Sequence, residues 1–187
     1  MPYTEGVQRQ TRQHRTREAL IGASLQLFTE RGYEAVTMEQ VAERAGVSRR
    51  TAFRYFPSKE SLVFPRQEER LAEFEALLAG CSTLPQVRAA FLRLAEAYAA
   101  NPAEILAQHR IVGTRPELLA RDFQMDQRWE EVVVRALSEL PGRRARFHAA
   151  ALVGLARAVL REWCEGGATE DLKTLAEEAL STLGELS

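Results

Sequence analysis

The chain has 187 residues, of which 45% are hydrophobic and 27% are charged, a composition typical of a folded globular protein and not of a disordered one. This length suffices for one domain of ordinary size, or for a small domain joined to a medium one. No apolar run is long enough to span a membrane, and residues 1–17 are polar and rich in arginine, which argues against a signal peptide. We therefore expect a cytoplasmic protein that has no contact with a membrane.

Charge is distributed unevenly along the chain, although the net charge is only −1. Residues 1–60 carry ten Arg and Lys against seven Asp and Glu, a net charge of +3, whereas residues 61–187 carry fifteen against nineteen, a net charge of −4. A basic first third suits a segment that faces a polyanion. A difference of this size also arises when arginines are merely scattered, so it decides nothing alone.

Cysteine and histidine give no sign of a metal site. Cys81 and Cys164 are far apart in the sequence and lack metal-ligand spacing, so we expect free thiols, with a redox-sensor role as the minor alternative. The histidines, His14, His109 and His148, are scattered. We expect neither a metal nor a cofactor.

Helix signals dominate and predict an all-α fold of about nine helices. The first three are predicted at residues 11–31, 38–45 and 49–55. Thr37 and Gln40 form a capping box before the second helix, and Ser48 is the expected N-cap of the third. Gly32 and Gly46 end the first two helices.

Six further helices are predicted beyond Pro57, which breaks the chain. Ser58 is expected to cap a long helix that reaches Ala79, where Gly80 ends it. The others begin at the Thr and Asn caps of residues 83, 101, 114 and 169, and at residue 143.

Residues 38–56 carry the pattern that indicates a function. Ala42 is small enough for two helices to cross there, and Gly46, four residues later, can adopt the positive φ of a tight turn. Small aliphatic residues fill the contact between the two helices: Val41, Ala45, Val47 and Ala52. This arrangement is typical of a helix-turn-helix, whose second helix, about residues 49–55, enters the major groove of double-stranded DNA.

Four side chains of that second helix are expected to point away from the packing face: Arg49, Arg50, Thr51 and Arg54. Arginine suits bidentate contact with guanine, and a threonine methyl can contact the methyl group of thymine. Tyr55 and Lys59 lie at the edge, where we expect contact with phosphate. Any small helical hairpin can contain Ala-x-x-x-Gly, so the spacing alone leaves that alternative open.

The residues around this motif favour a DNA-binding helix-turn-helix over an ordinary helical hairpin. The stretches 27–33, 41–48 and 53–60, with Thr37, closely resemble the TetR family of regulators. The resemblance implies a three-helix DNA-binding domain, a fourth linking helix and a dimeric helical ligand-binding domain. By position it implies DNA contacts from six residues: Thr37, Arg49, Arg50, Thr51, Tyr55 and Lys59. Phe53 replaces the family's usual Tyr and Ala52 a larger aliphatic, so we expect one phosphate contact to be absent and the helix packing to be looser.

We accordingly expect residues 1–57 to form the helix-turn-helix domain and residues 58–187 a helical bundle that binds a ligand and dimerises. Residues 115–121 and 163–167 resemble the acyl-CoA-like ligand-binding branch of that family. The expected function is a repressor that a small hydrophobic or acyl-CoA-like molecule releases from a near-palindromic operator. The sign of regulation is open, so an activator is an alternative.

Two apolar stripes near the C-terminus predict the interface of a homodimer. The candidate residues are Leu152, Ala156, Val159 and Leu160 in one helix and Leu172, Leu175, Ala179 and Leu183 in the next. The alternative is that both stripes pack only inside one subunit.

A cavity for the small-molecule effector is expected among the middle helices. Its candidate lining residues are Tyr98, His109, Phe123, Trp129 and Phe147. Ordinary core packing is the alternative for each of them.

Two other functions fit less well. An enzyme with a DNA-binding head needs a nucleophile with its base, a phosphate-binding glycine loop or a metal cluster, and none of these motifs is found, so no catalytic residue is assigned. A DNA-binding regulator whose C-terminal domain only dimerises or binds a protein partner is the main alternative, and a missing cavity would favour it.

Overall fold

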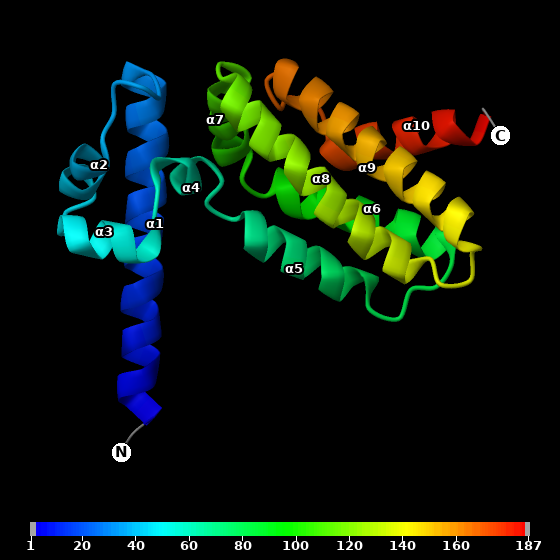
Figure 1. The fold of residues 1–187 in the computed structure, drawn as a ribbon, viewed down its shortest axis with the longest axis horizontal. Helices are drawn as coiled ribbons and strands as arrows, with labels where there is room; N and C mark the ends of the chain where they lie inside the picture. Colours follow the sequence, from blue (N-terminus) through cyan, green and yellow to red (C-terminus); the bar gives the residue numbers. More distant parts are fainter. Residues whose placement is uncertain (1–2, 186–187) are drawn as a thin grey trace. The chain divides into compact units, whose positions relative to one another are not determined.

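A computed structural model describes residues 3–185, with the side chains of residues 11–182, and every regular element in this range is a helix (Figure 1). The ten helices are α1 (Tyr3–Arg31), α2 (Met38–Arg44), α3 (Arg49–Tyr55), α4 (Lys59–Val63), α5 (Gln67–Leu78), α6 (Leu84–Ala99), α7 (Pro102–Gly113), α8 (Pro116–Ala136), α9 (Gly142–Glu165) and α10 (Leu172–Glu185). The all-α prediction is confirmed. No helix of the described residues is both long and apolar enough to cross a membrane.

The predicted long helix of residues 58–79 is wrong, and its division accounts for the tenth helix. The backbone leaves helical geometry at Phe64, with φ −114° and ψ 56°, and α5 begins at Gln67. Pro65 is the cause, because a proline has no N–H to donate and disfavours helical geometry in the residue before it. The first helix is also longer than predicted and begins at Tyr3.

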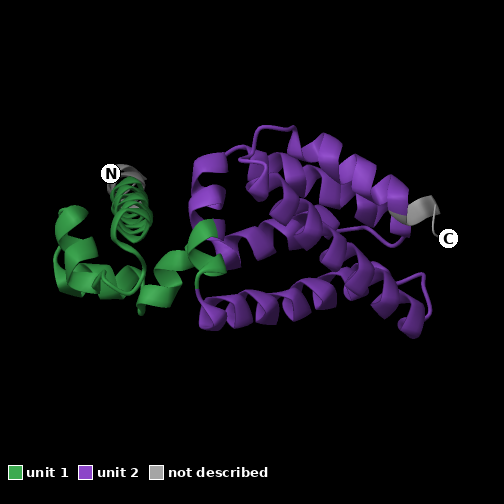
Figure 2. Ribbon diagram, turned by 90° about the horizontal axis from the view of Figure 1, so that it is seen from above, with its two compact units in different colours: residues 1–65, 110–114 green, residues 66–109, 115–187 purple. Residues whose placement is uncertain are grey.

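The chain divides into two compact units (Figure 2). Unit 1 consists of residues 1–65 and 110–114, and unit 2 of residues 66–109 and 115–187. The first division lies eight residues after the boundary expected at residue 57. The reason is that α4 packs on α1 and buries Leu62 and Val63 completely.

In unit 1 the helix α1 supplies most of the core. Leu20, Leu27 and Phe28 are at most 2% exposed, and the Phe28 ring lies 5.2 Å from the Tyr33 ring. Because α2 and α4 both pack on α1, and α3 packs on α2, the short helices are held by one long one.

In unit 2 the core is centred on Phe74 of α5, which is fully buried. Its ring centroid lies 4.8 Å from that of Phe91 in α6 and 5.0 Å from that of Trp129 in α8. Burial of one such side chain stabilises the fold by about 2 kcal/mol. Helices α9 and α10 complete unit 2: α9 packs on α8, and α10 packs on α6 and α9.

A second cluster in unit 2 contains Trp163 and Cys164 of α9. The Trp163 indole Nε1 donates a hydrogen bond to the carbonyl oxygen of Glu170 at 2.9 Å. Both cysteines are free, and burial raises the pKa of the Cys164 thiol to about 11. The reactive form of a thiol is the thiolate, so this buried group disfavours the redox-sensor alternative.

Candidate nucleic-acid interface and pocket

The turn between α2 and α3 is built by two backbone hydrogen bonds. The Gly46 N–H donates to the Glu43 carbonyl at 3.0 Å, and the Val47 N–H donates to the Ala42 carbonyl at 2.9 Å. Together they form a Schellman motif, which needs a left-handed residue after the helix, and Gly46 provides it with φ +68°. The prediction that Gly46 makes this turn is confirmed.

Side-chain caps define where both helices begin. The Gln40 N–H donates to Thr37 Oγ1 at 3.3 Å and the Thr37 N–H donates to Gln40 Oε1 at 2.9 Å, which is the predicted capping box. The Thr51 N–H donates to Ser48 Oγ at 3.2 Å. Two of the predicted DNA-contact residues, Thr37 and Thr51, thus belong to the caps that orient α2 and α3, and the Thr51 hydroxyl lies 2.9 Å from that of Ser48.

Small side chains allow α2 and α3 to pack closely, as predicted. Val41 and Ala52 are completely buried and Ala42 is 2% exposed. Ala52, where looser packing was expected, is therefore fully enclosed. This packing fixes which side of α3 is left for solvent.

The solvent side of α3 is basic. Arg49, Arg50 and Arg54 are all exposed, and Arg50 and Arg54 are neighbours one turn apart. Phe53 is 38% exposed, and the Arg49 guanidinium lies 5.4 Å from the centre of its ring. Among the described residues, neither Arg50 nor Arg54 forms an ion pair, so both charges are available to a polyanion.

Glu39 of α2 forms an ion pair with Arg49, a contact that the sequence did not predict. Arg49 Nε lies 2.7 Å from Glu39 Oε1. The pKa of the Glu39 carboxyl is lowered, chiefly by a hydrogen bond from its own backbone N–H and further by Thr37 and the charge of Arg49. The carboxylate therefore stays ionised at neutral pH and holds Arg49 through Nε, which leaves the Nη donors of the guanidinium for a phosphate or a base.

Lys59 and Tyr55, the two residues expected at the edge of the interface, already contact other side chains or backbone. Lys59 Nζ donates to the Tyr33 carbonyl at 3.0 Å and lies 4.1 Å from the centre of the Tyr33 ring. Tyr55 is half-buried, with the Arg54 guanidinium 5.3 Å from its ring centre. The Lys59 ammonium uses one of its donors on Tyr33 and keeps the others for a phosphate.

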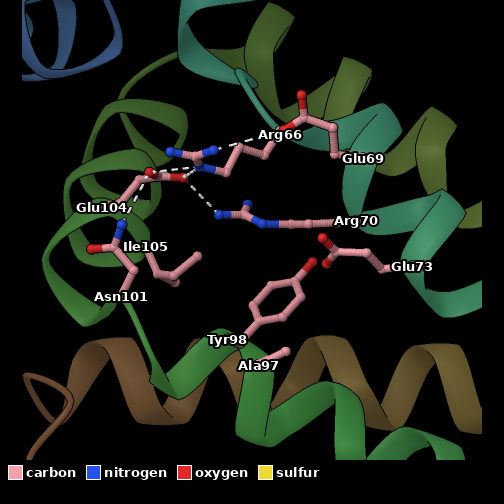
Figure 3. A pocket seen from close by; sticks show the side chains of 9 residues that line it. All are labelled: Arg66, Glu69, Arg70, Glu73, Ala97, Tyr98, Asn101, Glu104 and Ile105. Carbon is pink, nitrogen blue, oxygen red and sulfur yellow. Dashed lines mark hydrogen bonds and ion pairs between the residues drawn. The ribbon is translucent and has the colours of Figure 1, made fainter. Parts of the chain in front are cut away.

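Unit 2 contains a pocket of about 260 Å³ between α5, α6 and α7 (Figure 3). Most of its lining side chains are polar. They include Arg66, Arg70 and Glu73 from the α5 side, Tyr98 from α6, and Asn101 and Glu104 at the start of α7. Unit 2 thus has a pocket, and it is more polar than the cavity predicted among the middle helices.

Glu104 holds two arginines at one wall of the pocket, and we call Arg66, Arg70 and Glu104 the clamp. The Glu104 side chain is only 6% exposed. Arg66 Nε donates to its two oxygens at 3.0 and 3.2 Å, and Arg70 Nη2 donates to Oε1 at 2.8 Å. Asn101 Nδ2 donates to Oε2 at 3.2 Å. The clamp ties α5 to α7 through partners 34 and 38 residues apart, a distance over which no sequence pattern signals a contact.

Two family models match this chain. Residues 20–64 match that of the bacterial regulatory proteins of the tetR family, and residues 81–186 match that of the MftR C-terminal domain. The transcriptional regulator TcmR of Streptomyces glaucescens is 34% identical over 94% of this chain and 85% of its own length. This chain belongs to the tetR family of bacterial regulatory proteins.

Other TetR-family proteins are similar to this chain over most of its length. The putative mycofactocin biosynthesis regulator MftR of Mycobacterium tuberculosis is 27% identical over 76% of this chain and 73% of its own. The fold is similar to that of the TetR-family repressor FadR of Thermus thermophilus, crystallised with lauroyl-CoA, at a TM-score of 0.63 and 23% identity, covering 89% of this chain and 92% of FadR. These relatives are regulators and not enzymes, so the chain is a DNA-binding regulator of transcription.

The five residues predicted to contact the ligand of this TetR-family protein do not surround one cavity. Tyr98 lines the pocket, and Trp129 packs on Phe74 in the core. Phe123 is 55% exposed beneath the guanidinium of Arg157, and Phe147 is 66% exposed. His109 is half-buried and is not one of the lining residues.

Three of the predicted dimer residues lie in the core of one protomer. Leu152, Val159 and Leu172 are at most 7% exposed and belong to the core of one protomer, so they offer no surface to a second copy. Four others are half-buried against the same core: Ala156, Leu160, Leu175 and Ala179. The side chain of Leu183 lies outside the described residues.

Proposed function

We propose that this regulator is a repressor that binds a near-palindromic operator as a homodimer and leaves it when a small molecule binds in unit 2. The observation that carries the proposal is the exposed basic face of α3, held outward by the Schellman turn at Gly46. Acting on chromosomal DNA, it would work in the cytoplasm. An activator is the alternative, because the basic face of α3 supports binding to DNA whatever the sign of regulation.

Reading of DNA is assigned to three arginines of α3: Arg49, Arg50 and Arg54. Each arginine that makes a bidentate contact with guanine contributes about 1–3 kcal/mol of discrimination between bases. Each that contacts phosphate instead steepens the salt dependence of binding. Thr37, Thr51, Tyr55 and Lys59 are proposed as supporting contacts with the backbone.

The test is a band shift with DNA from upstream of the protein's own gene. We expect Arg49→Ala/Arg50→Ala to weaken binding by at least a hundredfold. The control is Arg93→Ala/Arg135→Ala, which removes the same charge from exposed positions of α6 and α8, outside α3 and α9, and should change the affinity less than threefold. Equal losses in the two double variants would contradict the assignment.

The outer face of α9 is the proposed dimer interface. It carries a stripe of Phe147, Ala150, Gly154 and Ala158, of which Phe147 is 66% exposed. A Cβ added at Gly154 would meet nothing within 4 Å, so the backbone is open to close approach there. An exposed apolar stripe of this kind marks an interaction surface.

Charge fixes the register in which a second copy fits. If two α9 helices cross antiparallel at Gly154, residues equally distant from Gly154 face each other across a two-fold axis. Arg143 then faces Glu165 of the partner subunit, and Arg146 faces Glu162 of the partner subunit. Each opposite-charge pair occurs twice, because the interface is symmetric.

Sedimentation equilibrium tests this interface. We expect Gly154→Glu to give a monomer, because it places two carboxylates at the crossing point, and Ala76→Glu on exposed α5 to leave the dimer intact. Arg146→Glu should weaken the dimer, and Arg146→Glu/Glu162→Arg should restore it. Failure of the double exchange to restore the dimer would exclude this register.

Release by a ligand requires that the ligand bind the released state more tightly than the DNA-bound one. The alternative is a C-terminal unit that only dimerises. Titration of small molecules into the operator complex distinguishes the two hypotheses. If the C-terminal unit only dimerises, no molecule that enters the pocket changes the affinity for DNA.

A further inference from the structure

We propose that the pocket of unit 2 binds a small organic cation, a molecule with a protonated amine or amidine on a compact body. The inference rests on the proposed function only in that the cation would be the effector. Three features of the pocket lead to this class of ligand: its size, the pairing of its two arginines with Glu104, and the acceptor oxygens of Glu73 and Tyr98.

Size limits the ligand to a compact molecule. The pocket holds about 260 Å³, just below the range of about 300–1,000 Å³ that is usual for small-molecule sites. Its apolar lining is confined to Ala97 and Ile105, which cannot cover a long acyl chain. Lauroyl-CoA, which the FadR relative binds, is therefore a poor match for this pocket in volume and in polarity.

An anion is disfavoured because both arginines already hold a carboxylate. Arg66 and Arg70 donate four hydrogen-bond contacts between them, three to Glu104 and one, from Arg70 Nη1, to Gln108 Oε1 at 3.2 Å. An incoming carboxylate or phosphate would compete with Glu104 for guanidiniums whose charge is already paired, in a lining with a net charge of −1. Displacing Glu104, whose side chain is only 6% exposed, would leave a buried charge without its partners.

A cation is favoured by the groups on the opposite wall. The lining has three carboxylates against two guanidiniums, a net charge of −1. Figure 3 shows the Tyr98 hydroxyl and the Glu73 carboxylate pointing toward each other across the pocket, away from Glu104. Burial raises the pKa of the Tyr98 phenol, with smaller effects of Arg70 and other charges, so this group stays a neutral hydroxyl. An ammonium placed between Glu73 and Tyr98 would have the Glu73 carboxylate as an acceptor and would share the Tyr98 phenol oxygen with Arg70, whose guanidinium lies 4.9 Å from the centre of the Tyr98 ring.

The experiment compares molecules that differ only in charge. Two matched sets are titrated into the full-length protein by calorimetry without DNA: benzylamine, benzyl alcohol and benzoate, and tyramine, tyrosol and 4-hydroxyphenylacetate. We expect the amine of at least one set to bind at least tenfold more tightly than the alcohol and the carboxylate of the same set. If in both sets the amine binds no more tightly than the carboxylate, the proposal is overturned.

Variants place the binding in this pocket. Glu73→Gln should weaken the amine about fivefold and leave the alcohol unchanged, whereas Glu75→Gln, on the same helix but paired with Arg135, should change neither. Ala97→Phe fills the pocket from an exposed rim position and should abolish binding of the amine. Unchanged amine affinity in both Glu73→Gln and Ala97→Phe would overturn the site.

Operator release is measured separately. An amine that binds in calorimetry but does not change the band shift would sustain the pocket and contradict the ligand-released repressor. A protein that binds its operator but binds none of the amines preferentially would overturn the pocket proposal and leave the assignment of DNA binding to α3 intact.

Discussion

The two units position their functional groups in different ways. In unit 1 the bonds that orient α3 join close neighbours in the sequence, as Thr37 does with Gln40 and Ser48 with Thr51. In unit 2 the clamp joins Glu104 to arginines 34 and 38 residues away. Local bonds form whenever a helix forms, whereas remote ones need the whole bundle. We therefore expect remote contacts to dominate stability and local ones to adjust the DNA-binding surface.

The largest effect is expected in the core of unit 2. Phe74→Ala removes a fully buried ring that contacts Phe91 and Trp129 and should lower the free energy of unfolding by about 4 kcal/mol in urea denaturation. Phe123→Ala, at 55% exposure, should stay within about 0.5 kcal/mol. Similar values for the two variants would refute the view that Phe74 centres this core.

The clamp should come next. Glu104→Ala leaves Arg66 and Arg70 without their buried carboxylate and should cost about 3 kcal/mol. The matched control is Glu75→Ala, whose partner Arg135 is 62% exposed, with an expected loss below about 1 kcal/mol. If the control cost as much as Glu104→Ala, burial would not be what makes the clamp strong.

Gly46→Ala probes the turn that holds α3. No atom lies within 4 Å of the added Cβ, so the cost is the left-handed backbone alone, about 1–2 kcal/mol, with a parallel loss of operator affinity. Gly22→Ala is a control of opposite sign, because Gly22 lies inside α1 with equally open space, and alanine there should stabilise by about 0.5–1 kcal/mol. Thermal melts of both variants measure the difference, and the same sign for both would rule out strain at Gly46.

The smallest effect is expected at the cap of α2. Thr37→Ala removes the oxygen that accepts from the Gln40 N–H and should destabilise by about 1 kcal/mol. Thr37→Ser retains that oxygen and should be close to neutral. A loss in the serine variant as large as in the alanine variant would point to the threonine methyl group instead.

The sequence predicted unit 1 well because its signals act over three or four residues. The capping box, the turn at Gly46 and the outward arginines could all be derived from spacing. Helical spacing continues across Pro65, so it predicted one helix where the structure has α4 and α5. Spacing does not indicate the pairing of Arg49 with Glu39, since the two lie on different helices.

In unit 2 sequence spacing identified helices but not which side of each helix faces inward. Both sides of α9 repeat at helical spacing, one with Leu152 and Val159 and the other with Ala150 and Gly154. Burial in the structure separates them, because Leu152 and Val159 are at most 7% exposed whereas Ala150 and Gly154 are exposed. The polar pocket could not be predicted, because its lining comes from three helices whose pairing depends on the whole bundle.

Helix α7 belongs to both units, since residues 110–114 group with unit 1 and the preceding turns with unit 2. The polypeptide therefore passes between the units three times. A fragment cut after Pro65 would lack Ile111 and Val112, both buried, and would be an incomplete DNA-binding module. Such interleaving makes the two units difficult to exchange between regulators as cassettes. Glu104 also lies less than two helical turns from Arg110, the first residue of α7 that groups with unit 1. Substitutions near the pocket therefore act on the same helix that supplies Ile111 and Val112 to unit 1.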